Sequence, residues 1–236
     1  MSVQPSVAPA RSLRSLRGWG IAVIALIAGV VVTQLISALI DWATLADFER
    51  NWQHPGRGRQ EWSGGSWAGD LAMVLEVCAG VATVVWMWLA RRNTQVLNAA
   101  RHRLPIGWVI GAWICPVVNF WFPQMIMADI VRASDPATPA DAADLRGRPG
   151  SAAVTGWWVA FLVSWALTLV SLRFSTPRLR SQSTDEYYVY ALAPANGTGM
   201  IVADLLGVVA VAVSAVFLAV VIVRVQDWQD ARRGPV

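Results

Sequence analysis

The sequence predicts an all-α integral membrane protein with four transmembrane helices and one proline-broken hairpin, which either re-enters the membrane or lies at its surface. Hydrophobic residues make up 56% of the 236 residues, only 14% are charged, and the apolar residues gather in long runs. Soluble domains carry roughly 25% charged residues. The only histidines, His54 and His102, have no other ligand residues at metal-binding spacing, so we expect no metal site.

The predicted spans are apolar runs of membrane-crossing length. A transmembrane helix needs about 20 mainly apolar residues. The runs that meet this requirement are residues 18–40, 67–90, 154–172 and 200–223. The first run is longer than the apolar core of a signal peptide, about 7 to 15 residues, so it predicts a retained anchor rather than a cleaved leader. Residues 18–224 are therefore expected to form a single polytopic domain.

A proline interrupts the apolar segment at residues 105–130. Pro116 lacks an N–H and clashes with the preceding turn, so a straight helix breaks there. If the segment returns to its own side, thirteen of the nineteen arginines lie on the cytoplasmic side; if it crosses as a fifth, kinked span, ten do. Cytoplasmic loops are enriched in arginine, so the count favours a cytoplasmic hairpin. The kinked span stays open, because prolines also occur in spanning helices.

This topology places both tails, residues 1–17 and 225–236, in the cytoplasm. Two other segments carry aromatic residues between the spans. Trp42, Leu45, Phe48 and Trp52 recur at near-helical spacing, which indicates either a short interfacial helix or an irregular loop. Residues 173–199 hold all three tyrosines, which favours an aromatic belt at the lipid headgroups over a recognition surface.

The motif order within residues 88–136 resembles a known family. A tryptophan and an Arg-Asn pair are followed by Pro-x-Gly-Trp and then by Pro-x-x-Asn-x-x-x-Pro. The motif residues expected to be structural are Trp88, Pro105, Gly107, Trp108, Gly111, Trp113, Pro116 and Pro123. This order resembles the bacterial membrane protein family designated domain of unknown function 4328. The resemblance implies a multi-pass protein of the bacterial plasma membrane and supplies no activity, substrate or catalytic residue.

Polar residues inside the spans are the first candidate site. A charge at mid-bilayer costs roughly 2.5 to 3.5 kcal/mol, which singles out Glu76. Gln34 lies at a similar depth, and Asn119 approaches from the hairpin, so we expect the three to converge near the midplane. They form either a site for an ion, proton or small ligand or, as we prefer, a polar clasp that fixes helix register. Asp70 and Asp204 lie one turn inside the outer ends of their spans, which predicts ion pairing there rather than an ion pathway.

Basic residues beside the hairpin are the second candidate site. Each arginine near an anionic membrane surface contributes about 1 kcal/mol of attraction. The candidate contacts to lipid headgroups or to a partner are Arg91, Arg92, Asn93, Arg101 and Arg103. Asn93 also suits a helix cap.

The function predicted from these features is a non-catalytic membrane module that binds lipid, a partner protein or a second copy. The alternative is a small channel or transporter that uses Glu76 and Asn119. No catalytic or cofactor motif occurs, so we expect neither an enzyme nor a cofactor. We expect no nucleic-acid binding, because the arginines lie in short clusters beside apolar runs.

Overall fold

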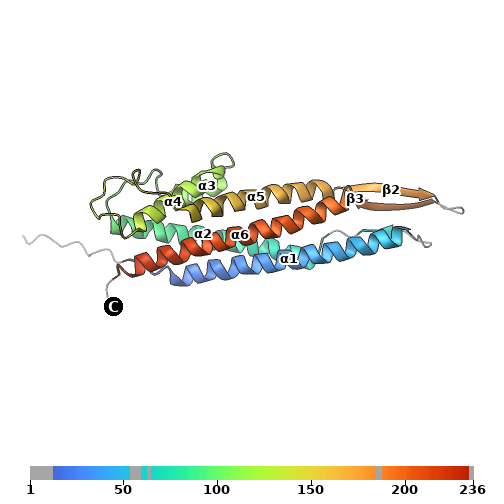
Figure 1. The fold of residues 1–236 in the computed structure, drawn as a ribbon, viewed down its shortest axis with the longest axis horizontal. Helices are drawn as coiled ribbons and strands as arrows, with labels where there is room; N and C mark the ends of the chain where they lie inside the picture. Colours follow the sequence, from blue (N-terminus) through green and yellow to red (C-terminus); the bar gives the residue numbers. More distant parts are fainter. Residues whose placement is uncertain (1–12, 54–59, 63–64, 184–187, 234–236) are drawn as a thin grey trace, which may run out of the picture. The chain divides into compact units, whose positions relative to one another are not determined.

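Four long helices dominate the computed structural model, which describes residues 13–53, 60–62, 65–183 and 188–233. They are α1 (Arg17–Gln53), α2 (Trp67–Leu97), α5 (Ala152–Ser175) and α6 (Gly197–Asp230) (Figure 1). Each is long and apolar enough to cross a membrane, which confirms the four helices predicted from the sequence. Only 22% to 33% of the residues in their most apolar windows are buried within the molecule.

The chain divides into two compact units. Unit 1 comprises Met1–Ile21, Ala82–Val154 and Val220–Val236, and unit 2 comprises Ala22–Val81 and Thr155–Ala219. The hairpin segment belongs to unit 1, and most of the residues of α1, α5 and α6 belong to unit 2.

Helix α1 extends well beyond the predicted span. Residues 42–52 continue it without a break, so the separate interfacial helix and the irregular loop were both wrong. The reason is packing within unit 2. Leu45 and Phe48 are only 7% and 6% exposed; Leu45 packs with Met200 on α6, and Phe48 packs with Ala191. Burial of these apolar side chains favours continuation of the helix.

The prediction of an all-α fold was wrong in one region, because unit 2 contains a three-stranded sheet. Its strands are β1 (Gln60–Glu61), β2 (Pro177–Ser183) and β3 (Tyr188–Pro194), in the order β1-β3-β2. β2 and β3 are antiparallel, and β1 is parallel to β3. In β3, exposed Tyr188 and Tyr190 alternate with buried Val189 and Ala191, which is the period of a strand with one covered face. Tyr187 lies outside the described residues.

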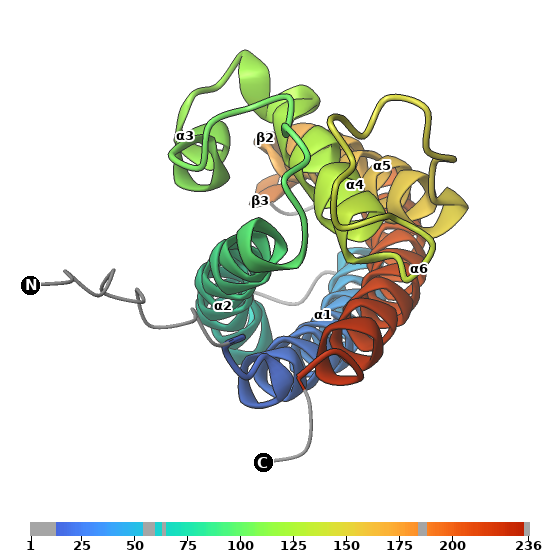
Figure 2. The same cartoon turned by 90° about the vertical axis from the view of Figure 1, so that its left-hand side faces the viewer.

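The proline-broken segment of unit 1 forms three short helices rather than one long one. These are α3 (Trp108–Ile114), the 3-10 helix η1 (Val118–Phe120) and α4 (Phe122–Ser134). Helices α3 and α4 contact each other, and the Trp108 ring meets the Phe122 ring edge-on with centroids 5.0 Å apart. The helical path breaks around Pro116, as expected from its missing N–H. Figure 2 shows the connecting turn between α3 and α4.

Candidate functional site

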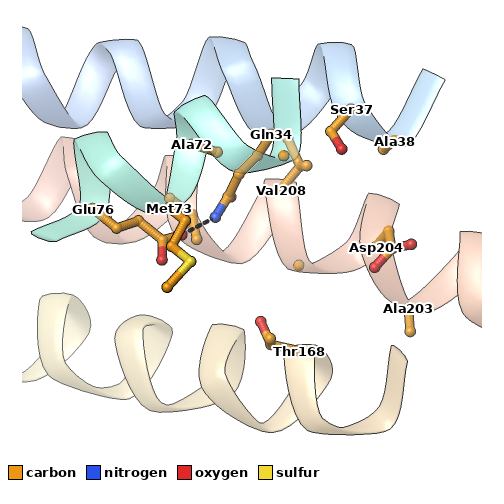
Figure 3. A pocket seen from close by; sticks show the side chains of 13 residues that line it. Gln34, Ser37, Ala38, Ala72, Met73, Glu76, Thr168, Ala203, Asp204 and Val208 are labelled. Carbon is orange, nitrogen blue, oxygen red and sulfur yellow. Dashed lines mark hydrogen bonds between the residues drawn. The ribbon is translucent and has the colours of Figure 1, made fainter. Parts of the chain in front are cut away.

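A pocket of about 200 Å³ lies between four helices of unit 2 (Figure 3). Its lining is a mixture of small, apolar and polar side chains. The lining residues are Gln34, Ser37 and Ala38 from α1, Gly69, Ala72, Met73 and Glu76 from α2, Thr168 from α5, and Ala203, Asp204, Gly207, Val208 and Val211 from α6. The lining includes two carboxylates and no basic side chain, so its electrostatic character is negative.

One hydrogen bond in this pocket joins two of the residues singled out from the sequence. Nε2 of Gln34 on α1 donates to Oε1 of Glu76 on α2 (Figure 3). A bond of this kind between two helices is what a polar clasp needs, and it also orients a carboxylate toward the pocket. The clasp and the ligand site both stay predictions for this pair.

A second carboxylate, Asp204, sits on the α6 side of the pocket. The Ser171 hydroxyl donates a hydrogen bond to it. Nearby on α1, Ser37 donates to Oδ2 of Asp41 at 3.4 Å and lies 2.9 Å from the Ser66 hydroxyl. Oδ1 of Asp41 is buried and has no hydrogen-bond partner among the described residues. Polar groups therefore continue from the pocket along this part of unit 2.

Asn119 does not line this pocket. It lies on η1 in unit 1, where its Oδ1 is buried without a hydrogen-bond partner in the described part of the chain. Of the three residues expected to converge, the structure thus joins Gln34 and Glu76 by a hydrogen bond and assigns Asn119 to the other unit. A shared role for all three stays a prediction.

Asn93, a candidate for headgroup contact, is engaged inside unit 1. Its side chain is 2% exposed, and Nδ2 donates to Oε1 of Gln229 at 2.7 Å and to the Arg14 carbonyl at 2.9 Å. Its Oδ1 accepts the backbone N–H of Arg14 at 2.9 Å. Gln229 in turn donates to Ser134 at 2.8 Å. This amide network links α2, α4, α6 and the segment before α1.

The arginines beside the hairpin have different surroundings. Arg92 and Arg101 are exposed, whereas Arg91 is buried and donates weakly to the Leu104 carbonyl at 3.5 Å. Arg103 is bound to Asp129 on α4: its backbone N–H and its Nε donate to the two carboxylate oxygens at 3.0 and 2.9 Å. Arg92 and Arg101 are thus exposed, whereas Arg91 and Arg103 have partners within unit 1, and contact of any of them with a headgroup stays a prediction.

Asp129 is a functional-site candidate that the sequence analysis missed. Its side chain is only 4% exposed and also lies 3.7 Å from Arg132. It is the single charged residue in the apolar stretch 125–131. A lone charge in an apolar stretch is the sequence feature that could have identified it. A buried carboxylate is stable only when it is paired, and here its pairing fastens the chain before α3 to α4.

His102 lies in the same region and is held neutral. The Thr94 hydroxyl donates to the Arg91 carbonyl at 2.7 Å, so Nε2 of His102, at 3.1 Å from that hydroxyl, is the donor of their contact. Nδ1 is buried and has no partner among the described residues. Burial, with the nearby cations Arg91 and Arg103, lowers the pKa of His102 to about 4, although Asp129 acts in the opposite direction.

Pro105, Gly107 and Pro123 lie where the short helices begin, and Gly111 lies within α3. The Pro105 carbonyl accepts the N–H of Trp108 at 3.0 Å as α3 begins, and Pro123 occupies the first turn of α4, where a missing N–H costs nothing. A Cβ at Gly107 would meet no atom within 4 Å, and one at Gly111 would meet only the ring of Trp108. These glycines therefore do not bring two helices into close contact.

The fold defines a helical protein with four helices of membrane-crossing length and a short-helix hairpin in unit 1. The family model named Domain of unknown function (DUF4328) matches residues 60–226, and the chain belongs to this family. The matched region includes the motif residues of the hairpin, which confirms the resemblance seen in the sequence. No curated protein and no solved structure matches the chain.

Proposed function

We propose that the chain is a non-catalytic module of the bacterial plasma membrane that contacts lipid through the tip of its hairpin, residues 114–121. The observation that carries this proposal is the exposure of large apolar side chains at the tip. Ile114 is 75% exposed, Val117 67%, Phe120 59% and Trp121 46%. In water such a contiguous patch is unfavourable and marks a surface that binds lipid or protein.

The backbone of the tip supports lipid as the partner. The N–H groups of Cys115, Asn119 and Trp121 donate to carbonyls within the hairpin at 3.1, 3.1 and 3.2 Å. Pro116 has no N–H to satisfy. Non-helical backbone is tolerated at membrane depth only when its polar groups have such partners. These three N–H groups of the tip therefore meet that requirement.

The dimensions of the hairpin limit how deeply it reaches. The seven residues of α3 extend about 10 Å along the helix axis. One leaflet of the hydrocarbon core is about 15 Å thick. The tip would therefore stay in the leaflet that it enters, and exposed Arg92 and Arg101 would lie near anionic headgroups of the cytoplasmic surface.

A native cysteine at the tip provides the experiment. Cys115 and Cys78 are the two cysteines of the chain, so Cys78→Ala leaves Cys115 as the sole thiol. We would attach an environment-sensitive fluorophore to Cys115 and measure quenching by spin-labelled lipids of different depths in proteoliposomes. Lipid labels should quench the fluorophore strongly, and aqueous iodide should quench it only weakly.

The matched control places the fluorophore on Ala140→Cys in a chain that lacks both native cysteines. Ala140 is exposed and lies in the loop after α4. Its probe should respond to iodide and not to lipid labels. Equal iodide quenching at positions 115 and 140 would contradict lipid insertion, and protection of position 115 from both quenchers would favour a protein partner.

The second candidate function is a small channel or transporter. It is favoured by the pocket in unit 2, where Glu76 and Asp204 place carboxylates among helices of membrane-crossing length. Cation flux into proteoliposomes, followed with sodium- and pH-sensitive dyes, tests it. Glu76→Gln should abolish flux, whereas Asp70→Asn, an exposed carboxylate on α2 outside the pocket, should not. Flux unaffected by Glu76→Gln would contradict this function.

A further inference from the structure

We infer that the pocket of unit 2 binds an elongated aliphatic diamine, with one ammonium group at Glu76 and the other at Asp204. The inference rests on the second candidate function, because it names the ligand class of that same pocket. Three observations support it: the acidic lining, the separation of the two carboxylates, and the apolar side chains between its ends.

The charge of the pocket calls for a cation. Both ionisable side chains in the lining are carboxylates, and the other polar lining groups are the neutral Gln34, Ser37 and Thr168. Asp41 lies close enough to Asp204 to act on it electrostatically, although it is outside the lining. Its Oδ1 is buried and accepts no hydrogen bond from any described residue. A bound ammonium group at this end would compensate Asp204, which has no cationic side chain beside it in the lining.

The separation of the carboxylates determines the shape of the cation. Figure 3 shows Glu76 and Asp204 at opposite ends of the pocket, with Val208 and Thr168 between them. On α6 the lining runs from Ala203 to Val211, a rise of about 12 Å. A single small ion at one end would leave the other carboxylate uncompensated. A ligand with a positive charge at each end would compensate both carboxylates.

The distribution of oxygens disfavours a metal ion. Calcium and magnesium take six or more oxygen ligands around one point. Among the residues that the structure describes, no group of three or more His, Cys, Asp or Glu side chains could hold a metal. The middle of the pocket is instead lined by small and apolar side chains, including Ala72, Gly207 and Val208. These suit the methylene chain of an organic dication.

Equilibrium binding to the full-length protein in detergent tests the inference. The probe is cadaverine, and pentylamine, which has the same carbon chain and one amine, is its matched control. Cadaverine should bind at least tenfold more tightly than pentylamine, because a second charge-assisted hydrogen bond forms. Glu76→Gln and Asp204→Asn should each weaken cadaverine binding to the level of pentylamine, and Asp70→Asn should leave it unchanged.

A second measurement needs no variant and so is independent of folding. A hydrophobic carbodiimide modifies carboxyl groups in the wild-type protein, and peptide mass spectrometry reads each site. Cadaverine should protect both Glu76 and Asp204 together, and pentylamine should not. Protection of neither residue, or equal affinity for the two amines, overturns the inference.

Flux measurements separate this inference from the transport function. Cadaverine binding without any cation or cadaverine uptake contradicts transport and leaves the ligand class standing. Cation flux that depends on Glu76 in a protein that does not bind cadaverine contradicts the ligand class. The ligand class is also contradicted if a basic transmembrane helix crosslinks to the pocket and no amine binds there.

Discussion

Asn93 on α2 and Gln229 on α6 are joined by a hydrogen bond of 2.7 Å across 136 positions of sequence. Both side chains are buried, at 2% and 1% exposure. The same Asn93 amide exchanges two hydrogen bonds with the backbone of Arg14, so three distant parts of unit 1 meet at one side chain. Buried amides with all their partners present give a fold one specific arrangement.

We expect Asn93→Ala to destabilise the protein by about 2 kcal/mol, because it leaves the Gln229 carbonyl oxygen and the Arg14 backbone without partners in a buried setting. Unfolding in mixed detergent micelles, followed by tryptophan fluorescence, measures this. Gln95→Ala, an exposed amide on the same helix, is the control and should change the free energy of unfolding by less than about 0.5 kcal/mol. If the two variants lowered the free energy of unfolding equally, the buried hydrogen bonds of Asn93 would not be important for stability.

Asp129→Asn should loosen the base of the hairpin. It removes the carboxylate that holds Arg103 and leaves that guanidinium without its charge partner. Loss of one member of a buried ion pair costs about 3 kcal/mol, somewhat less here because Arg103 is 35% exposed. Limited proteolysis should cut the chain faster near residues 101–108. Asp141→Asn, an exposed neighbour in the following loop, should leave the cleavage rate unchanged.

His102 gives stability a specific dependence on pH. Its pKa is about 4 in the folded protein, and an unfolded histidine has a pKa near 6.5. The unfolded state therefore takes up a proton first as pH falls, so stability is full above about 6.5 and declines toward 4, by up to about 1.4 kcal/mol per pH unit.

His102→Gln cannot titrate, so its free energy of unfolding should fall less steeply over this pH interval than that of the wild type. The two proteins share every other ionisable group. The difference between their slopes of unfolding free energy against pH therefore isolates the contribution of His102. Parallel slopes would show that the neutral, buried state of this histidine does not contribute to stability.

Gly156 on α5 should resist even the smallest side chain. A Cβ at this position would lie 2.7 Å from Cε2 of Phe217 on α6, and two more ring atoms lie within 2.9 Å. We expect Gly156→Ala to cost about 1 to 3 kcal/mol through overpacking. Phe217→Leu should partly rescue it. Gly80→Ala on α2, where a Cβ meets no atom within 4 Å, is the control and should be neutral or slightly stabilising.

The long helices could be predicted from the sequence, because apolar runs of membrane-crossing length are a local signal that needs no knowledge of contacts. The extension of α1 could not. Residues 42–52 are amphipathic and read equally well as a separate helix; only their packing, with Phe48 against Ala191 of a distant strand, decides the outcome. Strand β3 was not predicted, because its tyrosines suggested a membrane interface instead.

The candidate sites could also be predicted only in part, because local signals were visible in the sequence and contacts between distant residues were not. Glu76 and Gln34 stood out because polar side chains are rare in apolar runs, and a rare residue is visible without a structure. Their neighbour Asp204 belongs to another stretch of sequence, and its convergence with Gln34 and Glu76 depends on helix packing. Likewise, the polar side chain of Asn93 suggested surface contact, whereas its partner Gln229 lies far away in the chain and takes it inside.

The topology of the hairpin is the central claim, and cysteine accessibility tests it most directly. Single cysteines replace Ala140 and Ser183 in a chain without native cysteines, and intact cells receive a membrane-impermeant maleimide. If residues 105–130 return to the cytoplasmic side, Ser183→Cys is labelled and Ala140→Cys is labelled only after lysis. Labelling of Ala140→Cys in intact cells, with protection of Ser183→Cys, would show that the segment crosses the membrane.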